Sequence, residues 1–121
     1  MLTLKKDVQV QLLQPQMVLA AEVVNACYQN VGVKICQITS GSDGAHMSGS
    51  LHYQGRALDF SLLTVNSMEK RVTLVLQVES SLGPQYQVLY EAPTKPDSLP
   101  ARLFWKSSVL HLHVEYNPKL K

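Results

Sequence analysis

Two short segments contain most of the side chains in this chain that could bind a metal ion. The first runs from His52 to Asp59, and the second contains His111 and His113, so three of the four histidines lie in these segments. Imidazole nitrogens and carboxylate oxygens are common zinc ligands, and catalytic zinc sites combine three protein ligands with one open position. Together the two segments predict a site for one zinc ion with an open coordination position.

The same segments match a longer sequence motif, which reads Ser-x-His, then Gly-x-Ala-x-Asp, then His-x-His. The matching residues are Ser50, His52, Gly55, Ala57, Asp59, His111 and His113. This pattern resembles the motif of the zinc D-alanyl-D-alanine carboxypeptidases and of their relatives, the phage L-alanyl-D-glutamate endopeptidases, the VanX-type dipeptidases and the hedgehog signalling domain. Within this group the chain is most similar to the short phage-encoded members.

The resemblance implies a ligand set and a reaction. It implies that His52, Asp59 and His113 bind zinc. It also implies that His111 lies beside the metal without binding it. Since His111 shares a strand face with His113, we expect it to stabilise the oxyanion or orient the substrate, and the alternative is a packed histidine. The implied activity is that of a metallopeptidase, a hydrolase that cleaves peptidoglycan stem peptides containing D-amino acids in the bacterial cell wall.

Amide hydrolysis at such a site also requires a general base that takes a proton from water and passes it to the leaving amine. In the family an acid three or six residues before the last histidine ligand does this, and here those positions are Leu110 and Ser107. Glu91, at the end of a predicted strand, is the candidate base, and the alternative is a solvated acid at a strand terminus. Glu115 shares a strand face with His113 and is a second candidate base, or else a supporting or surface acid.

Three residues are candidate substrate contacts. They are Ser50, Arg56 and His46, and for His46 the competing interpretation is an exposed loop histidine. Peptidases of the family carry an arginine that binds the substrate carboxylate, in the loop that corresponds to residues 40–50 here. The comparable residues 40–43 include no arginine. Recognition of a substrate carboxylate is therefore not assigned to any residue.

The composition predicts a single globular domain, residues 1–121. Hydrophobic residues make up 45% of the chain and charged residues 17%. The formal net charge of +2 is too small to indicate binding to nucleic acid. No apolar run approaches the roughly 20 residues of a membrane helix, and no secretory signal is visible, so we expect a cytoplasmic protein at synthesis with no membrane partner. Cys27 and Cys36 are expected to be buried thiols, with a disulfide as the minor alternative.

Hydrophobic periodicity predicts the elements that position these residues. One helix begins near Pro15 and ends at Gly32, and a second spans residues 66–82, with Asn66 as N-cap and Glu69 three residues later. Strands are predicted at residues 7–12, 33–39, 56–63, 85–91 and 109–116. Residues 40–50 and 92–100 are rich in glycine or proline and are predicted to be loops.

These elements predict an α+β fold, in which an antiparallel sheet of about five strands has two helices packed mainly on one face. Strand alternation places His111, His113 and Glu115 on one face of the last strand. Asp59 lies between Leu58 and Phe60 and needs a partner, because an unpaired buried charge is costly. The metal site is therefore expected on the sheet face opposite the helices.

Two functions of different classes remain open. The first is a phage-encoded zinc peptidase, of carboxypeptidase or endopeptidase type, that acts on peptidoglycan peptides. The second is a catalytically silent zinc-binding structural or binding module, such as a virion component that contacts other phage structural proteins. Leu110 and Ser107 occupy the positions where the family has an acid, which favours the second function. The hedgehog domain shows that the fold can be retained for partner recognition. A third interpretation is that the histidines bind no metal and only form hydrogen bonds.

Overall fold

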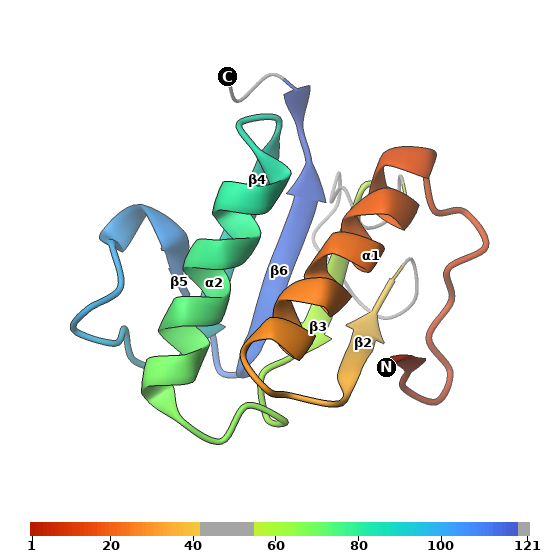
Figure 1. Ribbon diagram of the computed structural model, residues 1–121. Helices are drawn as coiled ribbons and strands as arrows, with labels where there is room; N and C mark the ends of the chain where they lie inside the picture. The colour runs from red at the N-terminus through yellow and green to blue at the C-terminus, as the bar shows by residue number, and fades with distance from the viewer. Residues whose placement is uncertain (42–54, 119–121) are drawn as a thin grey trace.

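Both α-helices within the described residues lie on the same face of a mixed β-sheet (Figure 1). The computed structural model describes residues 1–41 and 55–118. The helices are α1 (Pro15–Asn30) and α2 (Met68–Leu82), and a short 3-10 helix, η1, spans Ala101–Leu103. The strands are β1 (Leu2–Leu4), β2 (Cys36–Ser40), β3 (Ala57–Ser61), β4 (Tyr86–Ala92), β5 (Phe104–Lys106) and β6 (His111–Tyr116). The predicted α+β class is confirmed.

The six strands follow the order β1-β2-β3-β6-β4-β5. The four central strands, β2, β3, β6 and β4, are antiparallel to one another, whereas the edge strands β1 and β5 pair in parallel with β2 and β4. The prediction of an antiparallel sheet of about five strands is therefore right at the centre and wrong at both edges. The position of β6 between β3 and β4 matters most for function, because it brings three segments distant in sequence together.

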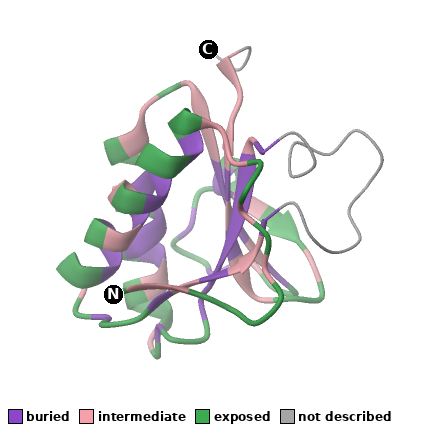
Figure 2. Ribbon diagram, turned by 90° about the vertical axis from the view of Figure 1, so that its right-hand side faces the viewer, coloured by how far each residue is buried: buried purple, intermediate pink, exposed green. Residues whose placement is uncertain are grey.

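Helix α1 packs one apolar face against the sheet. It begins at Pro15, as predicted, since the first helical turn needs no amide hydrogen from that residue. The buried residues of the helix repeat at helical spacing, and they are Met17, Ala20, Ala21, Val24, Cys27 and Tyr28. The Tyr28 hydroxyl donates a 2.7 Å hydrogen bond to the carbonyl of Ser61, which anchors the helix to the end of β3. Buried residues line the layer between helices and sheet (Figure 2).

Helix α2 begins one residue later than predicted from Asn66. Its N-cap is Ser67, whose Oγ accepts a 3.3 Å hydrogen bond from the amide of Lys70. Met68, the first residue of the helix, is 55% exposed. The core-facing residues are Val72, Leu74, Val75 and Val78. Gly83, with φ of 86°, ends the helix as predicted.

The strand predicted at residues 7–12 is absent, and the N-terminal strand is β1 instead. The amide of Lys5 makes the last contact with β2, a 2.9 Å hydrogen bond to the carbonyl of Ile38. Asp7 then adopts a left-handed conformation with φ of 70°, which breaks the extended chain. Val8 and Val10 pack partly buried against the core. Their alternation with polar residues therefore reflects an irregular, half-buried segment.

Cys27 and Cys36 are both buried and form no disulfide, which confirms the prediction of buried thiols. Burial raises the pKa of the Cys36 thiol to about 12, so this side chain is neutral over the physiological range. Neither helix within residues 1–41 and 55–118 has the length and apolar character that crossing a bilayer requires.

Candidate metal centre

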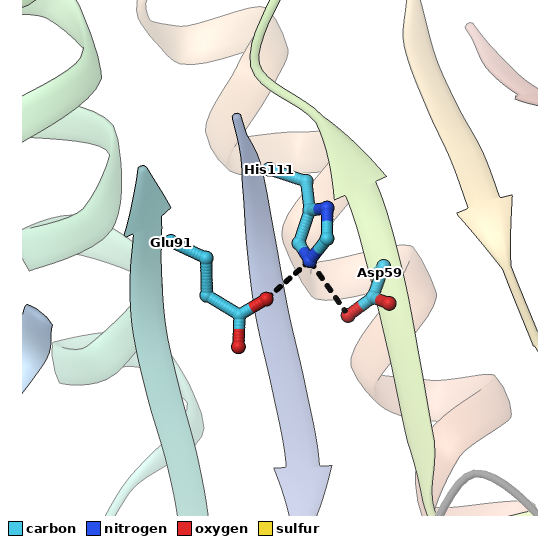
Figure 3. A group of neighbouring side chains, drawn as sticks. All are labelled: Asp59, Glu91 and His111. Carbon is cyan, nitrogen blue, oxygen red and sulfur yellow. Dashed lines mark ion pairs between the residues drawn. The ribbon is translucent and has the colours of Figure 1, made fainter. Parts of the chain in front are cut away.

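Strand β6 places its two histidines on the sheet face that the helices leave uncovered. Leu112 and Val114, which alternate with the histidines, are fully buried in the core on the other face. The Cα partner of His113 on β3 is Asp59, and the Cα partner of His111 on β4 is Glu91. Figure 3 shows Asp59, Glu91 and His111 projecting toward one another from three neighbouring strands, with the helices behind the sheet. These three side chains therefore lie on the sheet face opposite the helices, where the metal site was expected.

Five side chains on this face form a continuous series of contacts, here named the carboxylate–histidine chain: Glu91, His111, Asp59, His113 and Glu115. Glu91 Oε1 forms an ion pair with His111 Nε2. The same Nε2 lies 3.7 Å from Asp59 Oδ1, which is 2.9 Å from His113 Nδ1. His113 Nε2 in turn lies 2.8 Å from Glu115 Oε1. The Asp59 carboxylate is therefore the central group, with one imidazole on each side.

The carboxylate–histidine chain is largely shielded from solvent. The Asp59 side chain is 7% exposed, and the other four side chains are between 13% and 16% exposed. A buried carboxylate without partners would be strongly destabilising. The expectation that Asp59 needs a partner is confirmed, since both histidines face it.

The carboxylates change the protonation of both histidines. Burial alone lowers the pKa of His113, but hydrogen bonds to Asp59 and Glu115 outweigh it and raise the pKa to about 10. Burial also lowers the pKa of His111, and the hydrogen bond to Glu91 with the charge of Asp59 reverses this, so that the net pKa is raised. At neutral pH without metal, His113 is therefore protonated between Asp59 and Glu115, and the raised pKa of His111 favours its protonated form beside Glu91 and Asp59.

The same donor atoms could hold a metal ion in place of protons. One ligand atom each from Asp59, Glu91 and His111 lies within 4.8 Å of the others. His113 Nδ1 lies beside the Asp59 oxygen but is not one of these three donors. Mixed imidazole and carboxylate donors suit zinc but also other divalent transition metals, so the group of Asp59, Glu91 and His111 fits a metal ion without selecting zinc.

A glycine of the motif fixes the entry into β3. Gly55 has φ of 70°, and a Cβ atom added there would lie 1.9 Å from the carbonyl oxygen of Leu12. Its own carbonyl accepts a 2.9 Å hydrogen bond from the amide of Gln14, next to the start of α1. Only glycine combines this backbone conformation with so close an approach. Gly55 therefore sets where β3, and with it Asp59, begins against α1.

The structure assembles Glu115 and four of the other predicted site residues, and separates one. Asp59, His113, His111 and Glu91 all belong to the carboxylate–histidine chain. Arg56 precedes β3, and its carbonyl accepts a 2.8 Å hydrogen bond from the amide of Tyr116, which extends the strand pairing. Strand alternation then directs the Arg56 side chain to the face opposite Asp59.

Three of the predicted residues lie outside the described residues. They are His52, predicted as a zinc ligand, and Ser50 and His46, predicted as substrate contacts.

One neighbour of the site was missed by sequence reasoning. Trp105 on β5 is the Cα partner of Glu91 and is 61% exposed, so it lies on the same face at the rim of the cluster. Residues 104–106 form a strand too short to show alternation, and no sequence signal placed this tryptophan beside Glu91.

Comparisons of the chain with models of protein families, with curated proteins and with solved structures found no match in any of the three. Membership of the zinc peptidase family therefore stays a prediction that rests on the motif residues.

Proposed function

We propose that this chain is a zinc-dependent peptidase, related to the D-alanyl-D-alanine carboxypeptidases and encoded by a phage, that cleaves peptidoglycan stem peptides. One observation carries the proposal. The Asp59 carboxylate lies between His111 and His113, and Glu91 reaches the same cluster from the opposite neighbour of β6. This arrangement supplies metal donors and a separate acid on one face of a rigid sheet.

In this proposal His52, Asp59 and His113 hold the zinc ion. The fit rests on Asp59 Oδ1 and His113 Nδ1, which face each other at 2.9 Å and are both atom types that coordinate zinc. When bound, zinc lowers the pKa of a water ligand and polarises the substrate carbonyl. The largely buried surroundings strengthen the electrostatic effect of every charge in the site.

The neighbouring pair Glu91 and His111 provides the remaining groups. Glu91 acts as general base, taking the proton of the attacking water at its carboxylate and transferring it to the leaving amine. The raised pKa of His111 favours its protonated form, and Nε2 would donate to the oxygen of the attacked carbonyl as negative charge develops there. Glu91 and Asp59 orient the His111 ring for this role.

A peptidase assay with matched variants tests this assignment. Purified protein loaded with zinc would be incubated with a peptidoglycan stem peptide, and fragments or released D-alanine would be measured. We expect Glu91→Gln to retain zinc and lose at least ~100-fold in turnover, the lower range for a proton-transfer group. His52→Ala should lose both zinc and activity. Glu69→Gln, at an exposed helix position, serves as the control and should behave as wild type.

The second candidate function is a silent zinc-binding module, such as a virion component. It is favoured by the position of Glu91, whose oxygen groups with Asp59 and His111 closely enough to act as a metal ligand. Structural zinc sites use four protein ligands and leave no open position. In that case Glu91→Gln would lose the metal along with the stability it provides, wild type would not cleave stem peptides, and the protein would co-purify with virus particles.

A further inference from the structure

We propose that Glu115 is the positioning residue for His113, holding its ring in the tautomer that presents Nδ1 to the metal. The inference rests on the proposed metal centre and adds to it a residue that binds neither metal nor substrate. It replaces the interpretation of Glu115 as a general base.

The two carboxylates beside His113 contact different ring nitrogens. Asp59 Oδ1 lies 2.9 Å from Nδ1, and Glu115 Oε1 lies 2.8 Å from Nε2. Glu115 follows His113 by two residues on β6, so both side chains lie on the same sheet face. Their side chains are 14% and 13% exposed, which limits competition from water for this hydrogen bond.

The chemistry of imidazole turns this geometry into a tautomer assignment. A neutral imidazole has one N–H donor and one nitrogen lone pair, and a metal binds the lone pair. A carboxylate can only accept, so the contact with Glu115 requires the hydrogen on Nε2. The lone pair is then on Nδ1, the nitrogen that faces Asp59. Metal-binding histidines generally donate their second N–H in this way, which fixes ring orientation and raises ligand basicity.

The position of Glu115 argues against a direct part in proton transfer. The His113 ring separates it from Asp59, because each acid contacts the opposite nitrogen of that ring. Its Cα partners across the sheet are Ala57 and Gln87, which carry no charge. Glu91, in contrast, contacts the nitrogen of His111 that also faces Asp59.

Zinc affinity measured by competition with a chromophoric chelator tests the proposal. We expect Glu115→Ala to weaken zinc binding by about 10–100-fold, the usual loss for an outer-shell partner. Glu115→Gln should stay within a few-fold of wild type, since the amide oxygen still accepts from Nε2–H. Glu22→Gln, an exposed acid on α1, controls for the loss of one negative charge and should match wild type.

Long-range proton–nitrogen NMR of the zinc-loaded protein gives a second readout that a merely structural role would not move. We expect the His113 ring to carry its hydrogen on Nε2 in wild type and in Glu115→Gln, which keeps the test decisive if Glu115→Ala does not fold. The hydrogen on Nδ1 would overturn the proposal, as would equal zinc affinity for Glu115→Ala and wild type, and the metal centre itself would then still stand. Wild type that binds no zinc would overturn both.

Discussion

The Nδ1 atom of His113 lies 2.9 Å from Oδ1 of Asp59, although the two residues are 54 positions apart in the chain. The antiparallel pairing of β3 with β6 makes them direct neighbours. A buried carboxylate and a buried imidazole stabilise each other in this arrangement, and a metal ion that binds them would displace their shared proton to solvent. The predictions below follow from this exchange.

The first prediction concerns Asp59→Asn, which leaves His113 buried without its central anion. Removing one partner of a buried charge pair is expected to lower the free energy of unfolding by ~3–5 kcal/mol. Urea denaturation of the metal-free protein measures this loss. Asp97→Asn removes an exposed acid and should change stability by no more than about 0.5 kcal/mol. Similar values for the two variants would show that the Asp59 contact contributes little.

The second prediction is a loss of stability of the metal-free protein at high pH. The folded-state pKa of His113, about 10, lies above the unfolded value of roughly 6.5. Its contribution is therefore fully present below pH ~6.5 and is lost as pH rises through about 10. Urea denaturation between these limits should show a steeper decline for wild type than for His113→Gln. Parallel declines would mean that the His113 proton does not stabilise the fold.

The third prediction is that zinc binding releases protons and becomes stronger as pH rises. Zinc binds the neutral imidazole, so it must displace a proton from His113 at any pH below about 10. Isothermal titration in buffers of different ionisation enthalpy counts the protons released. We expect release of at least one proton per zinc ion bound to wild type at pH 7. Zinc binding without proton release would place the metal away from this histidine.

The fourth prediction compares two glycines with similar backbone conformation. Gly55 and Gly32 have φ of 70° and 83°, but a Cβ atom would meet the Leu12 carbonyl only at Gly55. Gly32→Ala should cost ~1–2 kcal/mol of stability for the left-handed conformation alone. Gly55→Ala should cost clearly more, and it should also weaken metal binding because β3 must shift. Thermal denaturation and zinc titration of both variants check this, and equal effects would remove the structural role assigned to the motif glycine.

The sequence predicts the helices and strands whose buried side chains repeat at regular spacing. The buried face of α1 from Met17 to Tyr28 repeats at helical spacing, and residues 111–116 alternate at strand spacing, so both could be predicted from sequence. The edge strands could not, since β1 and β5 have three residues each and pair in parallel with distant strands. The N-cap was missed by one residue because Asn66 and Ser67 are both suitable capping residues.

The candidate site was predictable only as far as the motif extends. The motif placed Asp59 and His113 together, and the structure pairs them in register. Strand alternation also places Glu115 on the same face as His113, but the contact of His111 with Glu91 depends on which strands flank β6. No periodicity in the sequence carries that information. Glu91 was a candidate because it ends a strand, and its register with His111 gives that choice a physical reason.

The most direct test of the account is the zinc content of protein purified without added metal, measured for wild type and His113→Ala. The account predicts about one zinc ion per chain in wild type and a large loss in the variant, with the far-ultraviolet circular dichroism of both proteins unchanged. Absence of zinc from wild type, or full zinc content in His113→Ala, would contradict it.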